Sequence, residues 1–260
     1  MARQPPQRNT APAVQKLRVR YAKRGRLRFT SHRDIQRALE RALRRAGVPM
    51  AYSAGFTPHP KISYAGAAAM GTASEAEYLE ISVTERLDPD RVREALDAAL
   101  PDGLDVVEVV EAAHMALTDR LQASAWRIEL AQVPVDQAQA ACEALLAAAE
   151  VEVERMMKAG PRRFDARGPI VRLAAQPGQT GSGDPCAILQ VVVRHSTPAV
   201  RPDDVLTALR QVAGLAPPVP PLVTRLAQGP LERESGQVAD PLAPDRTSDA
   251  DAVEADPRPR

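Results

Sequence analysis

Two histidines in the first quarter of this 260-residue chain have side chains suited to acid–base chemistry, because histidine titrates near neutral pH. His32 is expected at the start of a helix, where the helix dipole favours its neutral, basic form. His59 lies between two prolines in a loop that also contains Tyr52. Metal-independent cleavage of RNA needs a base, a cation and an acid, and His32, Arg33 and Tyr52 could supply them. The favoured interpretation is structural: His32 hydrogen-bonds a helix end, and His59 fastens a loop.

A metal or cofactor site is not expected in this chain. The four histidines are scattered, and none has a second ligand at the spacing of a metal site. Two cysteines are too few for a disulfide scaffold, a four-thiolate zinc site or a four-cysteine iron–sulfur site. Cys142 is expected in a helix core, whereas Cys186 follows a loop proline and is open to exposure. The sequence also lacks a glycine-rich phosphate-binding loop.

Positive charge is concentrated in the N-terminal part. The segment from Gln15 to Ile62 contains thirteen Lys or Arg residues and only two acidic residues, Asp34 and Glu40, although the whole chain has a net charge of +1. Such an asymmetry predicts a polyanionic partner, with a solvated basic face as the alternative. Aromatic residues lie in or next to the same stretch: Tyr21, Phe29, Tyr52, Phe56 and Tyr64. Basic side chains with interspersed rings are typical of sites for single-stranded nucleic acid.

The clearest structural prediction is an amphipathic helix over residues 32–46. Ser31 is its expected N-cap, with Asp34 three residues later, and Gly47 followed by Pro49 ends it. Apolar residues recur on one side at helical spacing. The opposite side presents arginines: Arg33, Arg37, Arg41 and Arg44. One side is therefore expected to pack, and the other to present guanidinium groups to phosphates.

An ordered loop is expected after this helix, over residues 50–61, because prolines and a glycine exclude a regular helix or strand there. Residues 55–61 would form a recognition edge, with Tyr52 and Phe56 stacking on bases or shaping a pocket. The expected nucleic-acid contacts are Arg33, Arg37, Arg41, Arg44, Tyr52, Phe56, His59 and Lys61.

The remaining pattern predicts an α+β fold with two tandem ferredoxin-like (βαββαβ) domains. Residues 15–114 form the first, basic domain. Residues 123–228 repeat its order with one extra strand, and residues 176–185 form a long loop between two strands. Arg162, Arg163 and Arg167 form a second basic cluster near a Gly-Pro turn, which either extends the anion site or is only a hydrophilic loop.

Both ends of the chain are expected to be disordered. Residues 1–14 are polar, and residues 229–260 form an acidic tail with eight Asp or Glu residues against four Arg, which could fold back on the arginines. The first ten residues contain no apolar signal segment, and no apolar run approaches the roughly 20 residues of a membrane span. A cytoplasmic protein without membrane association is therefore expected.

Residues 25–47 and 51–63, together with residues 75–79, resemble the bacterial radical-SAM-associated domain family of unassigned function. In that family the domain occurs alone or fused behind a radical S-adenosylmethionine (SAM) enzyme. The resemblance covers about residues 15–228 and is looser in the later part. Thr57 stands where the family commonly has Asn, and Arg33 where it often has Leu, but neither change removes a candidate acid or base.

This resemblance implies RNA as a ligand, with its class (tRNA or rRNA) left open, and a radical SAM enzyme or an RNase E/G-type ribonuclease as a partner. The chain lacks the three-cysteine motif of a radical SAM core, so any such chemistry belongs to the partner. The expected function is a non-catalytic RNA-binding or substrate-presenting module. One alternative is a metal-independent endoribonuclease, similar in architecture to CRISPR repeat-processing enzymes, with His32 or His59 as its base. The other is a docking module for an acidic protein.

Overall fold

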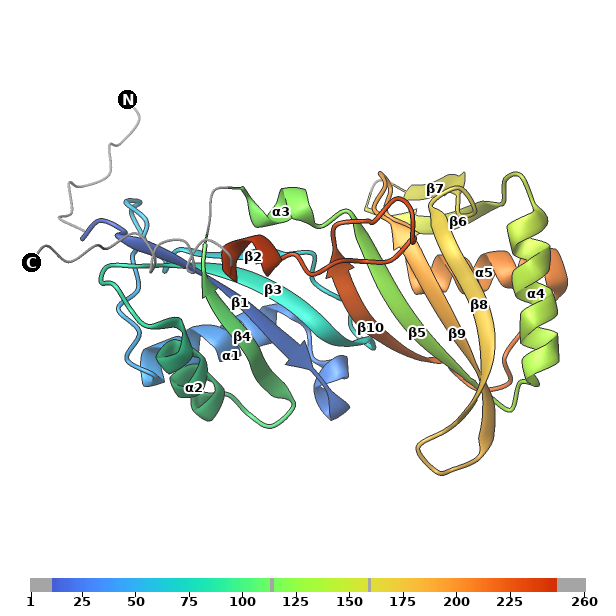
Figure 1. Ribbon diagram of the computed structural model, residues 1–260, viewed down its shortest axis with the longest axis horizontal. Helices are drawn as coiled ribbons and strands as arrows, with labels where there is room; N and C mark the ends of the chain where they lie inside the picture. The colour runs from blue at the N-terminus through green and yellow to red at the C-terminus, as the bar shows by residue number, and fades with distance from the viewer. Residues whose placement is uncertain (1–10, 113–114, 159, 247–260) are drawn as a thin grey trace, which may run out of the picture. The chain divides into compact units, whose positions relative to one another are not determined.

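The computed structural model describes residues 11–112, 115–158 and 160–246. The chain divides into two compact units, one made of Met1–Asp119 with Pro241–Arg260, the other of Arg120–Asp240. Each unit is a mixed α+β structure in which helices pack on an antiparallel sheet (Figure 1). Within the described ranges, no helix has the length and apolar character needed to cross a membrane.

The sheet of the first unit has the strand order β4-β1-β3-β2. Its strands are β1 (Gln15–Lys23), β2 (Ile62–Ala65), β3 (Ala73–Val83) and β4 (Leu104–Glu111). β1 alternates apolar and basic residues, so Leu17, Val19 and Tyr21 enter the core while Arg18 and Arg20 point to the opposite face.

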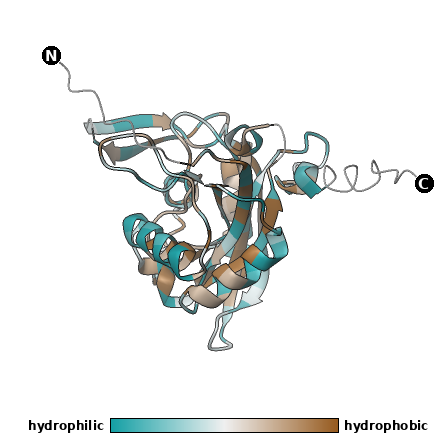
Figure 2. Cartoon of the chain, turned by 90° about the vertical axis from the view of Figure 1, so that its left-hand side faces the viewer, coloured by the Kyte–Doolittle hydropathy of each residue, from teal (hydrophilic) through white to brown (hydrophobic). Residues whose placement is uncertain are grey.

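Two helices cover the apolar face of this sheet: α1 (His32–Arg45) and α2 (Pro89–Ala99). The Ser31 hydroxyl accepts a hydrogen bond from the Asp34 main-chain N–H at 3.2 Å, which confirms the expected N-cap. Leu39 and Leu43 are buried, and each such side chain contributes about 1.5–3 kcal/mol to folding. Figure 2 shows that the helices turn their hydrophilic sides outward.

The sequence of residues 24–26 favours a turn and that of residues 27–29 an extension of the strand. In the structure, Gly25–Phe29 instead forms a short 3-10 helix, η1. Gly25 has a φ of +54°, which turns the chain after β1. The main-chain N–H of Leu27 then bonds to Arg24 O at 3.1 Å, and that of Thr30 to Leu27 O at 3.0 Å. These three-residue spacings are those of a 3-10 helix and not of a strand.

The second unit has the strand order β10-β5-β9-β8 and a separate hairpin of β6 and β7. Its elements are β5 (Ala123–Ala131), α4 (Val135–Ala147), β6 (Glu152–Met157), β7 (Gly160–Asp165), β8 (Ile170–Gln179), β9 (Pro185–Arg194), α5 (Pro202–Ala213) and β10 (Leu222–Gly229). Both helices share one core with the sheet, and Cys142 lies in it as expected. A short helix, α3 (Leu117–Arg120), lies where the chain passes between the units.

Three expectations for the second unit are wrong. Half of the loop expected over residues 176–185 is strand, because β8 and β9 run to a turn at residues 180–184. Arg162 and Arg163 lie on the strand β7 and not in a hydrophilic loop. The sequence of β7 contains a proline and two adjacent arginines, so it lacks the alternation of apolar and polar residues by which a strand is predicted. Cys186 is buried rather than exposed, because it lies on β9 and not in a loop.

The chain after β10 is ordered at least to residue 246, contrary to the expected tail from residue 229. Leu231 pairs with Val238, and Leu242 and Asp245 are fully buried in their surroundings. The prediction of disorder rested on the acidic composition and so assumed that every acidic residue is solvated. Asp245 is instead buried and paired with Arg18. The other residues of the expected tail, 247–260, and residues 1–10 of the expected lead lie outside the described part, as does His114.

Candidate nucleic-acid interface

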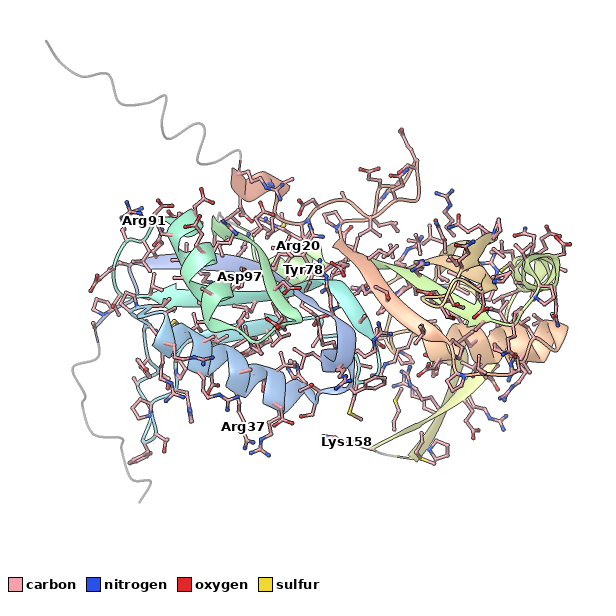
Figure 3. The ribbon with its side chains drawn as sticks, turned by 90° about the horizontal axis from the view of Figure 1, so that it is seen from below. Arg20, Arg37, Tyr78, Arg91, Asp97 and Lys158 are labelled. Atoms are coloured by element: carbon pink, nitrogen blue, oxygen red, sulfur yellow. The ribbon has the colours of Figure 1, made fainter. Side chains whose placement is uncertain are left out.

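The outer side of α1 presents four exposed arginines, which we call the arginine face: Arg33, Arg37, Arg41 and Arg44. Figure 3 shows Arg37 pointing outward from this helix. Its contact with Asp34 is loose, at 3.6 Å between two exposed side chains. Within the described residues, Arg33 and Arg41 form no ion pair. The arginine face can therefore bind phosphates without first breaking strong internal pairs.

The basic residues of β1 behave differently, because acidic groups and main-chain carbonyls of the first unit neutralise them. Arg18 is buried and pairs with Asp245 at 2.7 Å and with Glu80 at 2.9 Å. Burial works to lower the pKa of Arg18, but hydrogen bonds to these two carboxylates outweigh it and raise the pKa. Lys23 donates to two main-chain oxygens, at 3.2 and 3.3 Å. The excess positive charge is therefore concentrated on α1 and its flanks.

The loop at residues 51–61 is ordered, as expected, because main-chain bonds tie it across itself and to β3. The Ala51 N–H donates to Ser82 O at 2.8 Å, and the Lys61 N–H to Ala51 O at 2.8 Å. Within the loop, the His59 N–H donates to the Ser53 hydroxyl at 3.1 Å. This frame holds Tyr52 and Phe56 at the surface, 38% and 54% exposed. Their rings are available to stack on bases.

A pocket of about 220 Å³ lies between α1 and this loop. Its lining residues are Glu40, Leu43, Arg44, Met50, Tyr52, Pro58, Pro60 and Ile62. Arg44 also borders an open hollow with Arg41 and Arg45, so the pocket adjoins the arginine face. Phe56, His59 and Lys61 are exposed on the same loop but do not line the pocket.

His32 lies at the first turn of α1, and its ring packs edge-on against Tyr64, with centroids 5.5 Å apart. Its Nε2 lies 3.0 Å from the side-chain nitrogen of Gln36. An amide nitrogen only donates, so this Nε2 accepts and its lone pair is occupied. Among the described residues, no hydrogen bond or ring contact joins His32 to His59 or Tyr52. The described contacts of His32 are therefore with Gln36 and Tyr64.

Sequence reasoning missed several residues of this region. The sequence analysis considered Glu40 only as one of two acidic residues in a basic segment. In the structure, Glu40 lines the pocket. The Tyr64 hydroxyl is buried with no hydrogen-bond partner in the described part of the chain, and burial, then the charge of Glu40, raises its pKa. Phe29 and Met70 are 65% and 69% exposed, in segments that a 2.7 Å main-chain bond between Gly71 and Arg28 holds together. Alternation and helical period give no signal for such loop residues.

The second unit contains a serine–histidine pair that spacing along the chain could not reveal. His195 Nε2 lies 2.8 Å from the Ser124 hydroxyl, and its Nδ1 lies 2.7 Å from Leu121 O. Ser124 is only 2% exposed, so a substrate cannot reach its hydroxyl and the pair is structural. Nearby, Arg163 on β7 pairs with Glu154 at 3.0 Å, so the second basic cluster is partly neutralised. In the described ranges, no group of His, Cys, Asp and Glu could hold a metal.

Comparisons with known proteins give a family but no activity. The family described as "Uncharacterized protein conserved in bacteria (DUF2344)" matches residues 16–202. No curated protein matches the chain in sequence. Among solved structures, the encapsulated DyP-type peroxidase from Mycobacterium smegmatis is 9% identical, with a TM-score of 0.22 over 84% of this chain and 92% of that one. Ferric DtpA from Streptomyces lividans is 12% identical, with a TM-score of 0.22 over 85% and 88%. TM-scores this low support no argument about fold or activity.

Proposed function

Because the chain belongs to a family of uncharacterized proteins conserved in bacteria, we propose its function from its own residues: it is a non-catalytic module that binds RNA and presents it to a separate enzyme. The observation behind this proposal is the arginine face. Its guanidinium groups are exposed and at most loosely paired. On β1, by contrast, Arg18 is paired with a buried carboxylate and Lys23 donates to main-chain oxygens. If the basic residues only served to keep the protein soluble, those of α1 and those of β1 would be expected to be equally exposed and equally unpaired.

We propose a tandem ferredoxin-like arrangement as the framework of this module. The first unit has the strand order β4-β1-β3-β2, and the second the equivalent order β10-β5-β9-β8. The β6–β7 hairpin is then an insertion into the second copy. In the first unit, the two helices on one face leave α1 with its polar side outward. This arrangement displays a basic helix without any need for a catalytic cleft.

The proposed partner is a radical SAM enzyme or an RNase E/G-type ribonuclease, and the site of action is the cytoplasm. Support comes from the resemblance of residues 25–47 and 51–63 to the radical-SAM-associated domain family. The chain has two cysteines, so a three-cysteine radical SAM cluster would belong to the partner.

The direct test is binding of total cellular RNA across a salt series. The variant Arg37→Glu/Arg41→Glu reverses two charges of the arginine face, and Arg86→Glu/Arg91→Glu makes the same charge change outside α1. Loss of two single-strand phosphate contacts should reduce the slope of log affinity against log salt by about 1.4. Affinity should fall at least tenfold for the α1 variant only. Equal losses in both variants would mean that net charge alone attracts the RNA.

The same experiment separates the alternatives. If the recovered RNA is cut, and His32→Ala or His59→Ala abolishes the cutting, the protein is an endoribonuclease. If RNA does not bind even at low salt, the arginine face serves an acidic protein partner. Intact RNA with a modest loss of binding in the histidine variants is the result expected for a presenting module.

A further inference from the structure

The pocket beside the arginine face has features that phosphate binding does not use. Five of its eight lining residues are apolar, Leu43, Met50 and Ile62 among them, and the half-buried Glu40 is its acidic lining residue. At about 220 Å³ it is smaller than the roughly 300–1,000 Å³ of pockets for drug-sized ligands. We propose that this pocket receives one unstacked base of the bound RNA and that Glu40 selects guanine.

A base fits this position because phosphate and base sites adjoin there. Arg44 borders both the pocket and the open hollow that it forms with Arg41 and Arg45. A phosphate bound to these arginines would bring its attached base to the pocket mouth. Tyr52 lines the pocket with its ring 38% exposed, where it can stack on the entering base. The inference rests on the proposed RNA binding.

Glu40 is free to read the base. Arg44 follows it by one helical turn, but its Nε donates to the main-chain oxygen of Glu40, at 3.4 Å, and not to the carboxylate. No hydrogen bond or ion pair engages that carboxylate elsewhere in the described structure. The Tyr64 hydroxyl, close enough to feel the charge of Glu40, is also without a partner among the described residues. Of these two groups only Glu40 lines the pocket, so its carboxylate is the one that is available to a bound base.

Guanine is the base that a carboxylate matches best. An ionised carboxylate has two oxygens that only accept. The Watson–Crick edge of guanine offers two adjacent donors, N1–H and the N2 amino group, so both oxygens are satisfied. Adenine and cytosine place one amino donor beside an acceptor nitrogen, and uracil places one donor between two carbonyls. Each of those edges brings a lone pair toward the carboxylate, which is repulsive.

The test measures binding of fluorescent single-stranded hexanucleotides to the full chain. The probes are six uridines, and the same oligonucleotide with guanosine, adenosine or inosine at the third position. We expect guanosine to bind about tenfold more tightly than uridine or adenosine, and inosine, which lacks the N2 amino group, to lose most of that gain. Glu40→Gln should reduce the guanosine preference to below threefold and leave binding of the uridine probe unchanged or tighter. Glu143→Gln on α4 removes one charge elsewhere and should change neither value.

The possible failures are distinguishable. If the uridine probe binds with the expected salt dependence but guanosine gains nothing, RNA binding stands and the base assignment is overturned. If the guanosine preference survives Glu40→Gln in a variant that melts like the wild type, Glu40 is not the reading group. If no probe binds at any salt concentration, the proposed function and this inference fail together. Tyr52→Ala should weaken all four probes alike, because stacking is tolerant of base type.

Discussion

At the scale of single residues, the same side chain has different roles according to what lies opposite it. Arg18 and Arg37 both belong to the basic stretch that the sequence predicts to bind anions. Arg18 faces Glu80 across β1 and β3 and binds buried Asp245, whereas Arg37 has only a loose contact with exposed Asp34. Charge counts treat the two arginines as equal. Only the pairing of strands shows which of them is available to a ligand.

Phe56 gives a test at this scale. Its ring is 54% exposed and lies outside the hydrophobic core, so Phe56→Ala should leave the melting temperature within about 1 °C. If the ring stacks on a base, RNA affinity should fall about tenfold, which corresponds to roughly 1.4 kcal/mol. Anisotropy titration and a thermal melt measure the two quantities. Met156→Ala, which trims another exposed apolar side chain, should alter neither, and equal RNA affinity of Phe56→Ala and the wild type would exclude stacking.

The candidate site was partly predictable at this level. The arginines of α1 follow from helical period, and the exposed loop position of Tyr52 and Phe56 follows from prolines that exclude regular structure. Glu40 could not be found in this way, because its role depends on a pocket formed with a loop some ten residues later. Met70 also escapes sequence reasoning, since the bond between Gly71 and Arg28 that brings its segment next to that of Phe29 spans more than forty residues.

At the scale of elements, α1 and α2 were easiest to predict, since each has a capping residue and an apolar stripe. Ser31 before α1 and Asp88 before α2 both accept main-chain hydrogen bonds. The weak predictions were short or lacked alternation: η1, and β7 with its two arginines. β7 is stabilised by its partner β6, where Arg163 lies opposite Glu154. That information lies in the pairing and not in the segment itself.

The segment at residues 241–246 has a measurable stabilising role. Asp245 is fully buried and bonds Arg18 with both oxygens, at 2.7 and 2.8 Å. Asp245→Ala leaves a buried guanidinium without this counter-ion and should lower the free energy of unfolding by about 3–5 kcal/mol. Urea denaturation measures this loss. Arg246→Ala removes an exposed pair with Glu108 and should cost no more than about 1 kcal/mol.

A loss below about 1 kcal/mol for Asp245→Ala would contradict the assignment of residues 241–246 to the first unit. The double variant Arg18→Met/Asp245→Leu supplies a further check. It removes both charges at once, so most of the lost stability should return.

His195 makes the second unit sensitive to pH. Burial lowers its pKa below the ordinary 6.5, more than the bond to Leu121 O raises it. Below pH 6.5 the unfolded chain therefore takes up a proton that the folded unit refuses, so the free energy of unfolding falls as the pH decreases. Above that pH the stabilisation is fully present. Urea midpoints at pH 5.5 and 7.5 should differ less in His195→Gln than in the wild type, while exposed His59→Gln keeps the wild-type difference. Identical pH dependence in His195→Gln and the wild type would remove His195 as the cause.

At the scale of the whole molecule, charge is divided along the chain. The stretch from Gln15 to Ile62 has thirteen basic residues against two acidic ones, although the net charge is +1. Since much of the basic charge on β1 is neutralised inside the first unit, the outward field arises mainly from α1 and its flanks. We therefore expect the acidic residues at the end of the chain to compete with RNA for the arginine face.

Shortening the chain to end at Arg246 tests this competition. Residues 247–260 contain four acidic residues and two arginines, so their removal makes the protein more positive by two charges. RNA affinity should rise about two- to threefold at low salt and should not change at high salt, where charges are screened. Filter binding at the two salt concentrations measures both values. Unchanged affinity at low salt would exclude a role for these acidic residues in masking the arginine face.

The buried pair of Arg18 and Asp245 also determines when the first unit can be completed during synthesis. The two residues are 227 positions apart, and a ribosome adds about 5–20 residues per second. Asp245 is therefore made roughly ten to forty-five seconds after Arg18. The second unit, contained wholly within Arg120–Asp240, is translated in that interval. All residues of the second unit are thus synthesised before the first unit receives Asp245, which is the reverse of the order in which the two units begin.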